Sequence, residues 1–485
     1  MPAEAGVPLG ALAALVGGRV VGDPAVRIAE VTHDSRLATE GSLFVAIPGF
    51  RQDGHDFLEA AAGRGARAVC VERASVVPIP QLVVGAGRRA LPLLAAEVYG
   101  HPSRRLAVVG VTGTNGKTTV THMLEAIAEA AGLPAGLVGT VGGRVAGRPV
   151  HLARTTPEAG DFQRLLGAMV ADGVRLAAVE VSSHALALHR VDATWFEVAA
   201  FTNLSQDHLD FHGDLETYYQ AKAGLFRPER AGRAVIWIDD PAGRRLIDAA
   251  ALPVTTVGLS EGAEVGAEDL ECGIGESVFV LRLPEGRRKL RVPIGGEFNV
   301  ANALVAVACA RAVGLPLEAI ASGLEGMAKV PGRFESVEAG QDFAVVVDYA
   351  HTPQGVAYVV EAARRLVGGR VIVVVGAGGD RDRLKRPLMG RAAGRAELVV
   401  VTSDNPRSED PSAIVREVAD GARESEAGVL EEPDRRLAIR AAVRMAAPGD
   451  IVLILGKGHE QGQEVGAGLV PFDDRQVARE ELEAR

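Results

Sequence analysis

Short runs of Val, Ile, Leu and Ala recur along the chain and alternate with longer stretches rich in Ala, Leu, Arg and Glu. The short runs have strand length and are apolar on successive residues, which is typical of parallel strands buried on both faces. Strands are predicted at residues 106–111, 176–181, 344–347, 371–375, 398–401 and 451–455. Stretches between them, such as 118–131 and 411–422, have helical composition. The alternation predicts a doubly wound α/β fold, in which ligands bind at the carboxyl ends of the strands.

Two turn-rich segments interrupt this pattern. Residues 99–105 (YGHPSRR) and 330–334 (VPGRF) each precede a new strand. A chain of 485 residues is too long for one hydrophobic core, so we predict three domains, at residues 1–102, 103–334 and 335–485. We expect a smaller N-terminal α/β domain, a central doubly wound sheet of the P-loop type and a C-terminal Rossmann-like domain.

Composition narrows the choice of partners and compartment. The formal net charge of −10 argues against nucleic acid as the main partner, because phosphate backbones are bound by basic surfaces. No uncharged run approaches the length of a membrane span, and residues 1–18 predict a short amphipathic helix rather than a leader. The three cysteines, Cys70, Cys272 and Cys309, are far apart, which predicts neither a disulfide framework nor a metal site. A cytoplasmic protein is expected.

Lysine is scarce in this chain. Of 52 basic residues only six are lysines, at positions 117, 222, 289, 329, 385 and 457. Nucleotide bias that replaces interchangeable lysines by arginines explains the scarcity without invoking function. The lysines that remain are then enriched at positions that require a compact amine able to lose its proton.

Residues 108–119 (VVGVTGTNGKTT) run from a predicted strand into a predicted helix and have the composition of a phosphate-binding loop. Small residues let backbone N–H groups surround phosphate oxygens, a lysine adds charge, and a threonine hydroxyl can bind Mg²⁺. The spacing departs from the usual P-loop because Val111 stands where glycine is common. The alternative is an incidental glycine-rich turn. The residues expected to bind ATP are Thr112, Gly113, Thr114, Asn115, Gly116, Lys117 and Thr118.

TGTNGKTT at 112–119 resembles the ATP loop of the Mur ligase family, and further motifs follow in that family's order. They are VEVSSH (179–184), FTNLSQDHLDFH (201–212), YQAK (219–222), FNVAN (298–302), PGR (331–333) and DYAHTP (348–353). The resemblance covers most of the chain. It implies a three-domain α/β ligase that activates a carboxylate with ATP.

The resemblance also implies two magnesium ions, one of them with an unusual ligand. Thr118 and Glu180 would hold the nucleotide magnesium, and His208 would help to hold the second together with a carbamate that CO₂ forms on Lys222. Arginine could not form this adduct because its pKa is too high. The alternatives are a histidine satisfied within a polar loop and a surface lysine on an amphipathic helix. By the same resemblance, Lys117 and Arg333 stabilise the transferred phosphoryl group, Asn302 contacts adenine and Asp348 contacts the ribose.

The acceptor substrate is assigned by resemblance alone. Ser35 and the loop Phe50, Arg51 and Gln52 resemble the contacts to uridine diphosphate, whereas Thr155, Thr156, Ser182 and Arg190 resemble the contacts to the muramoyl peptide. His33, Arg154 and Leu188 depart from the pattern of a known relative, so one polar contact to the substrate is expected to be absent or replaced.

The incoming amino acid is indicated by loops near the C-terminus. Diaminopimelate carries a distal carboxylate and ammonium, so a selective site needs a cation and an acid. The residues expected to bind it are Arg381, Asp404, Asn405, Pro406, Arg407, Gly456 and Glu460. DNPR at 404–407 resembles the motif of the diaminopimelate-adding branch rather than the lysine-adding one. The alternative is that Arg407 only closes its own loop, through an ion pair with Asp404 or Glu409.

Together these expectations describe an enzyme of peptidoglycan precursor synthesis. It would add meso-diaminopimelate to UDP-MurNAc-L-Ala-D-Glu through an acyl phosphate, act as a monomer on small molecules, and need neither nucleic acid nor membrane. Lysine or ornithine as the substrate stays open. A D-Ala-D-Ala-adding ligase or a folylpolyglutamate synthetase is disfavoured by DNPR (404–407) with GKGHE (456–460). The alternative outside the family is a nucleotide switch without ligase activity.

Overall fold

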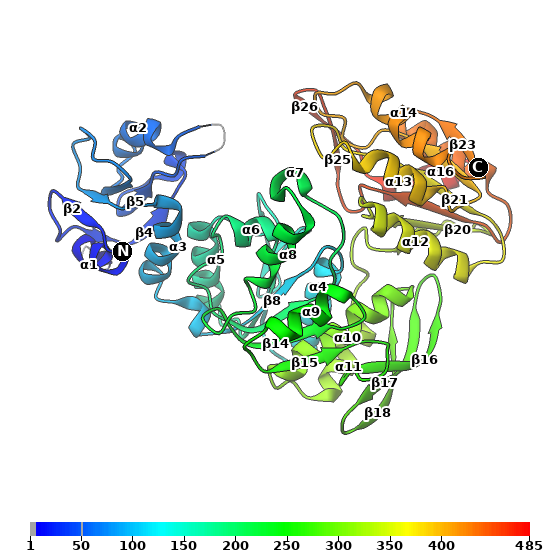
Figure 1. Cartoon of the computed structure of the whole chain (residues 1–485), viewed down its shortest axis with the longest axis horizontal. Helices are drawn as coiled ribbons and strands as arrows, with labels where there is room; N and C mark the ends of the chain where they lie inside the picture. The colour runs from blue at the N-terminus through cyan, green and yellow to red at the C-terminus, as the bar shows by residue number, and fades with distance from the viewer. Residues whose placement is uncertain (1–5, 50–51) are drawn as a thin grey trace.

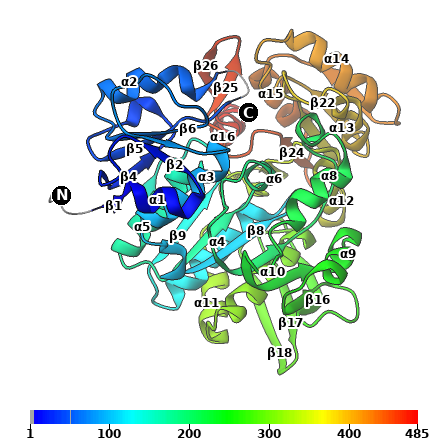
Figure 2. The ribbon, with the colours of Figure 1, turned by 60° about the vertical axis from the view of Figure 1, so that its left-hand side comes forward.

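The computed structural model describes residues 6–49 and 52–485, which form an N-terminal, a central and a C-terminal lobe, each built around one main sheet (Figure 1). Both outer lobes lie on the same side of the central lobe, also after a turn of 60° (Figure 2). Within the described residues no helix is long and apolar enough to cross a membrane. The division at residues 102 and 334 into independent domains stays a prediction.

The N-terminal lobe has a five-stranded sheet in the order β2-β7-β6-β5-β4, parallel except for β2. Its strands are β2 (Arg19–Val21), β4 (Glu30–Thr32), β5 (Ser42–Val45), β6 (Ala68–Val71) and β7 (Gln81–Val83), with a separate pair β1 (Val7–Pro8) and β3 (Arg27–Ile28). Its helices are α1 (Leu9–Val16), α2 (Leu58–Gly63) and α3 (Gly87–Val98), with 3₁₀ turns η1 (Ser35–Leu37) and η2 (Gly54–Phe57). The predicted N-terminal helix is α1.

The central lobe has an eight-stranded sheet in the order β11-β10-β9-β12-β8-β13-β14-β15. Its strands are β8 (Ala107–Thr112), β9 (Ala135–Gly139), β10 (Gly142–Val145), β11 (Arg148–Val150), β12 (Leu176–Glu180), β13 (Phe196–Phe201), β14 (Ala231–Trp237) and β15 (Val254–Val257). A three-stranded antiparallel sheet follows, with β16 (Gly266–Cys272), β17 (Ser277–Leu283) and β18 (Gly286–Val292). The helices are α4 (Lys117–Ala130), α5 (Ala159–Ala171), α6 (Ser183–Ala187), α7 (Leu209–His212), α8 (Leu215–Ala223), α9 (Pro241–Ala249), α10 (Glu297–Ala312) and α11 (Leu317–Gly326), preceded by η3 (Pro102–Arg104).

The C-terminal lobe has a six-stranded sheet in the order β19-β20-β24-β21-β22-β23, parallel except for β19. Its strands are β19 (Glu335–Ser336), β20 (Ala344–Asp348), β21 (Val371–Val375), β22 (Leu398–Val401), β23 (Gly428–Glu431) and β24 (Ile451–Leu455). A hairpin of β25 (Gly462–Val465) and β26 (Gly468–Pro471) follows β24. The helices are α12 (Pro353–Leu366), α13 (Lys385–Ala393), α14 (Pro411–Ala422), α15 (Arg435–Met445) and α16 (Asp474–Glu483).

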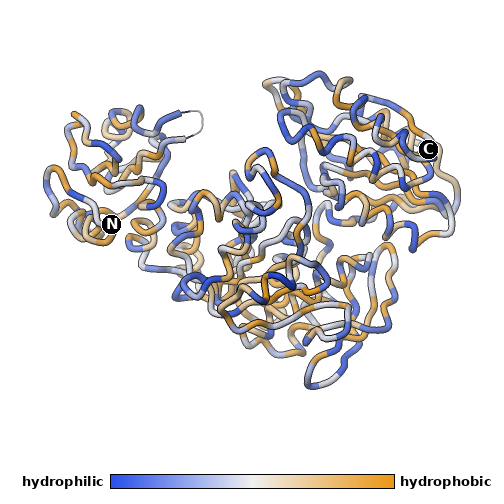
Figure 3. Tube along the Cα trace, in the orientation of Figure 1, coloured by the Kyte–Doolittle hydropathy of each residue, from blue (hydrophilic) through white to orange (hydrophobic). Residues whose placement is uncertain are grey.

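Both faces of the central sheet are buried. One core lies between the sheet and α4, α10 and α11, and a second lies on the opposite face against α5 and α6. Apolar residues accordingly follow the strands in Figure 3. The six predicted strands correspond to β8, β12, β20, β21, β22 and β24, and the two predicted helices to α4 and α14, so the doubly wound fold class is confirmed.

Candidate functional site

The phosphate loop joins β8 to α4 in a conformation that requires glycine. Gly113 and Gly116 have φ values of 151° and 89°, where other residues are strained. A Cβ at Gly113 would overlap the Thr202 hydroxyl, and one at Gly116 would overlap the Asn302 amide. Asn203 fixes the loop, because its side-chain oxygen accepts a hydrogen bond from the Asn115 N–H at 2.9 Å. The loop therefore lies against β13 and α10, with its backbone close to both.

Two lysines converge on one carbonyl of this loop. The Nζ atoms of Lys117 and Lys222 each donate a hydrogen bond of 2.8 Å to the Gly113 carbonyl oxygen. Lys222 is only 1 % exposed, and its amine lies 4.3 Å from the centre of the Tyr218 ring. Burial lowers the pKa of Lys117 and places that of Lys222 well below its usual value, which favours a neutral amine. The alternative of a surface lysine at 222 is wrong.

Glu180 lies at the end of β12 beside the loop. One carboxylate oxygen accepts a hydrogen bond from the Thr140 N–H at 2.8 Å, and the other accepts one from its hydroxyl at 2.9 Å. A Cβ at Gly139 would overlap Glu180, so glycine gives the carboxylate its space. Thr118 lies in the first turn of α4, and its hydroxyl accepts a hydrogen bond of 2.9 Å from Arg333.

His208 caps the short helix α7 with a φ of 55°. Burial lowers its pKa to about 3, so the imidazole is neutral and can bind a metal. Within the described chain, no group of three or more His, Cys, Asp or Glu side chains is arranged to hold a metal ion. The expected set is compatible with this finding, because Thr118 and a modified Lys222 would complement Glu180 and His208 with the oxygen ligands that Mg²⁺ prefers.

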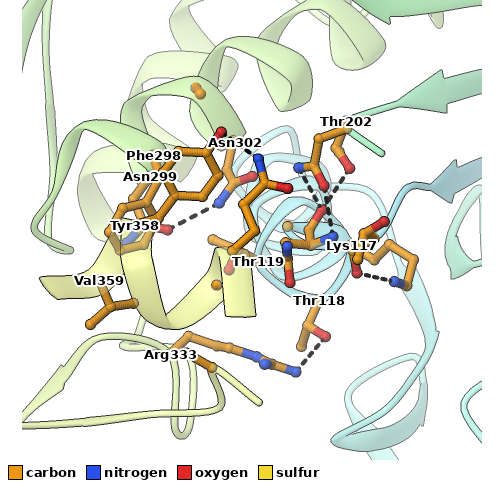
Figure 4. A pocket seen from close by; sticks show the side chains of 18 of the residues that line it. Lys117, Thr118, Thr119, Thr202, Phe298, Asn299, Asn302, Arg333, Tyr358 and Val359 are labelled. Carbon is orange, nitrogen blue, oxygen red and sulfur yellow. Dashed lines mark hydrogen bonds between the residues drawn. The ribbon is translucent and has the colours of Figure 1, made fainter. Parts of the chain in front are cut away.

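A cavity of about 880 Å³ joins these groups to the C-terminal lobe. Phe298, Asn299 and Asn302 enter it from α10, whereas Tyr358 and Val359 enter it from α12 (Figure 4). The Asn302 amide donates a hydrogen bond of 3.1 Å to Asn299. The cavity thus offers apolar and amide groups beside the phosphate loop.

Arg333 lies in the segment between α11 and β19 that links the central and C-terminal lobes, whereas Asp348 ends β20, and both line the cavity. The Arg333 guanidinium lies 4.4 Å from the centre of the Tyr349 ring, and Figure 4 shows it extended toward Thr118. The Asp348 carboxylate accepts hydrogen bonds from the N–H groups of Phe334 at 2.7 Å and Ala350 at 2.8 Å. Asp348 therefore holds the linking segment at Phe334 against the end of β20.

The residues expected to contact the muramoyl peptide lie next to Glu180. The Thr156 hydroxyl donates a hydrogen bond of 2.7 Å to the Glu180 carbonyl and accepts one of 3.1 Å from the Ser182 N–H. The Thr155 and Thr140 hydroxyls are 3.1 Å apart. Thr155 and Ser182 line the cavity.

Arg190 forms an ion pair of 2.9 Å with Glu158, which Arg154 also approaches at 3.9 Å. Arg88 also pairs with Glu158, at 3.4 Å, so the unexpected Arg154 adds a third positive charge there. Ser35, in η1, and Gln52 belong to the N-terminal lobe and are not among the described residues that line the cavity. Phe50 and Arg51 lie outside the described residues.

The loops expected to bind the incoming amino acid meet around Lys457, which is fully buried. Its amine donates hydrogen bonds of 3.0 Å to Asn405 and to Glu460, and the Asn405 amide donates one of 2.9 Å to Glu460. A Cβ at Gly456 would overlap Asp404. Asp404, Asn405, Gly456 and Glu460 are therefore brought together at the ends of β22 and β24.

Arg407 follows Pro406 with a φ of 52° and donates a hydrogen bond of 2.8 Å to the Gly379 carbonyl. Its Nε lies 2.5 Å from a carboxylate oxygen of Glu464, on the hairpin β25–β26. The alternative ion pairs with Asp404 or Glu409 are therefore wrong, since Glu409 is instead paired with Arg386. Arg381 is exposed, on the adjacent loop.

Two groups that support this site had no signal in the sequence. Arg435, on α15, forms a fully buried ion pair of 2.7 Å with Asp474 and donates hydrogen bonds to the carbonyls of Ser403 and Leu455. It thereby fixes the carboxyl ends of β22 and β24. The Gln463 amide donates a hydrogen bond of 2.6 Å to the Asp404 carbonyl. One arginine among many, and one glutamine in a hairpin, cannot be singled out by residue type.

Comparison with known proteins places this geometry in a family. Residues 27–111 match "Mur ligase family, catalytic domain", residues 111–310 match "Mur ligase middle domain", and residues 332–458 match "Mur ligase, glutamate ligase domain".

Two curated relatives are named UDP-N-acetylmuramoyl-L-alanyl-D-glutamate–2,6-diaminopimelate ligase. The protein of Gloeobacter violaceus is 48 % identical over 95 % of both chains. That of Geobacillus thermodenitrificans is 46 % identical over 94 % of this chain and 95 % of its own. A solved structure of a ligase with the same name is 32 % identical and covers 99 % of both chains with a TM-score of 0.70. MurF ligase of Thermotoga maritima in complex with ADP shares the fold, with a TM-score of 0.66 over 94 % of this chain and 96 % of its own at 21 % identity. The chain therefore belongs to the Mur ligase family.

Proposed function

We propose that the protein is an ATP-dependent ligase that joins meso-diaminopimelate to the D-glutamate of UDP-MurNAc-L-Ala-D-Glu and releases ADP and phosphate. The observation that carries the proposal is the buried amine of Lys222, 2.8 Å from the Gly113 carbonyl of the phosphate loop. A lysine held in this way has no purpose in a simple nucleotide switch. The names of the curated relatives support the same reaction and the same amino acid.

A neutral Lys222 amine can add to CO₂, forming an N–C bond and releasing one proton, which leaves a carbamate. Thr118, Glu180, His208 and this carbamate would hold magnesium, which supplies positive charge at the phosphates. Thr140 supports the set by orienting both oxygens of Glu180.

The reaction itself must convert a carboxylate into an acylating group. The D-glutamate γ-carboxylate attacks the γ-phosphorus of ATP, so an O–P bond forms and ADP leaves. The amine of the incoming amino acid then attacks the acyl carbon, and phosphate leaves as the amide forms. Lys117, bonded to the Gly113 carbonyl, and Arg333, bonded to the Thr118 hydroxyl, stabilise the negative charge that develops on the transferred group. Closure of the lobes would exclude water from the acyl phosphate.

The amino acid would bind across the loops of the C-terminal lobe. Arg407 presents a guanidinium to the distal carboxylate of diaminopimelate, and Arg381 adds a second cation. Glu460, held by Lys457 and Asn405, presents an acid to the distal ammonium. Lysine lacks the distal carboxylate, so the same loops would leave Arg407 without a substrate partner.

An amino-acid panel tests the proposal. ADP release is measured with UDP-MurNAc-L-Ala-D-Glu and, separately, meso-diaminopimelate, lysine or ornithine. We expect turnover that requires both substrates and favours diaminopimelate. Arg407→Ala should raise the KM for diaminopimelate by about 30-fold or more, because a charged hydrogen-bonding partner is lost. Arg416→Ala, on the surface of the same lobe, serves as the control.

The outcomes separate the alternatives. Equal or faster turnover with lysine or ornithine would reassign the amino acid but keep the ligase. Slow ATP hydrolysis that needs neither substrate would favour a nucleotide switch. Because ATP and nucleotide-linked sugars are cytoplasmic metabolites, we also propose that the protein acts in the cytoplasm, as a monomer, which size-exclusion chromatography would test.

A further inference from the structure

A buried carboxylate connects the central and C-terminal lobes. Asp207 lies in the loop after β13 and is 5 % exposed. One of its oxygens lies 3.4 Å from Nε2 of His208 and 3.7 Å from Nε2 of His351, and the other lies 3.8 Å from the Lys385 amine. His208 belongs to the central lobe, whereas His351 follows β20 and Lys385 begins α13 in the C-terminal lobe.

Three of these four side chains line the cavity, and the fourth does not. Asp207, His208 and His351 line the nucleotide cavity, but Lys385 is not among the described residues that line it. Lys385 is nevertheless buried, with a side chain 10 % exposed. It therefore contacts the Asp207 carboxylate without itself lining the described part of the cavity.

Burying these charged groups has a free-energy cost. A carboxylate removed from water is costly unless cations and hydrogen bonds compensate it, and removing one partner leaves the other unpaired. A buried lysine carries the same cost. Lys385 is also one of only six lysines in a chain of 485 residues. Neutral side chains of similar size would avoid the free-energy cost of burying both charges, so packing alone does not explain the pair.

We propose that Asp207 and Lys385 are positioning residues for the ligase reaction. Lys385 anchors the Asp207 carboxylate from the C-terminal lobe, and Asp207 in turn orients His208 and His351 at the cavity. The orientation of His208 then depends on how the C-terminal lobe is seated. This inference rests on the proposed function, because the step it supports is phosphoryl transfer at the site that contains His208.

A double-mutant cycle tests the pairing with Asp207→Asn, Lys385→Met and the double variant. In the ligase assay we expect each single variant to lower kcat by about tenfold or more, with the KM for ATP changed by less than about threefold. The double variant should be no slower than the slower single variant. Lys385→Arg should recover part of the activity, since it keeps the charge. Lys289→Met, at an exposed lysine on β18, is the matched control.

The same cycle is read a second time by urea unfolding, which does not need turnover. Coupling between the two substitutions in both readouts supports the proposal. Additive effects on kcat, or an effect confined to the KM for ATP, would overturn it, and so would coupling in unfolding without coupling in kcat. If the wild-type protein shows no turnover that depends on both substrates, the proposed function is wrong. If, in addition, the effects of the two substitutions on the free energy of unfolding are additive, the pairing of Asp207 with Lys385 is wrong as well. Where Lys385→Met does not fold, Lys385→Gln replaces it.

Discussion

At position 222 the proposed carbamate depends on the chemistry of a single side chain. The buried lysine can be neutral and add to CO₂, whereas arginine stays charged. We expect Lys222→Arg to lower ligase turnover by at least about 100-fold. Binding of ATP should remain measurable by calorimetry, because Lys117 and the loop backbone are intact. Turnover close to wild type would exclude the carbamate.

Buried histidines predict how stability responds to acid. Burial lowers the pKa values of His122 and His459 from 6.5 to about 4. Between pH 6.5 and about 4 the unfolded chain therefore binds protons that the folded chain does not. Stability falls as the pH falls through this window, by up to about 1.4 kcal/mol per pH unit for each histidine.

Urea unfolding between pH 7 and pH 5 measures this dependence, above the range in which carboxylates titrate. His122→Gln should reduce the slope of unfolding free energy against pH, and His151→Gln, at an exposed position, serves as the matched control. Equal slopes in all three proteins would contradict the assignment.

At the scale of elements, the carboxyl ends of β22 and β24 are fixed by one ion pair. Arg435 and Asp474 are both buried, so Asp474→Asn leaves a buried charge without its partner. We expect the free energy of unfolding to fall by about 3–5 kcal/mol. Glu480→Gln, which removes a partner from Arg436, whose side chain is 42 % exposed, should have little effect. Thermal and urea unfolding of both variants provide the comparison, and similar losses would show that burial does not decide the outcome.

A second element-scale prediction concerns the approach of two loops. Gly332 has a φ of 64°, and a Cβ there would overlap the backbone of Gly458 and His459. Gly332→Ala should force the Arg333 loop away from residues 456–460 and lower kcat by about tenfold or more. Gly340→Ala, where a Cβ meets open space although φ is 85°, controls for backbone strain alone. Equal kcat in both variants would argue that the loop contact is dispensable.

The sequence anticipated elements whose pattern is local and continuous. The buried strands β21 and β24 are unbroken apolar runs, and α4 follows a recognisable loop. The antiparallel strands β16–β18 and the hairpin β25–β26 have mixed polarity, so they were not predicted. The residues of the site were likewise predictable only where the signal is local in the sequence. Motif residues such as Lys222 carry a family signal, whereas the contacts of Arg435 join segments far apart in the chain and depend on the folded structure.

At the scale of the whole molecule, the cavity beside the phosphate loop is lined from two lobes at once. α10 contributes residues from the central lobe and α12 from the C-terminal lobe, so the proposed nucleotide would stabilise both. Mg²⁺ and ADP at about 100 times their Kd should raise the free energy of unfolding by about 2.7 kcal/mol. Differential scanning calorimetry measures the shift, and Lys117→Ala should largely abolish it. A shift of equal size in that variant would place the nucleotide elsewhere.

Because both lobes line the cavity, cutting the polypeptide between them would divide the cavity as well. Ala328 and Lys329, between α11 and Arg333, are exposed and, along the chain, separate the lining residues of α10 from those of α12. Two fragments separated there would each carry only part of the proposed ATP pocket, so neither fragment would contain the complete pocket. If the two fragments were expressed from separate genes, binding of the nucleotide would therefore stabilise the reassembled enzyme.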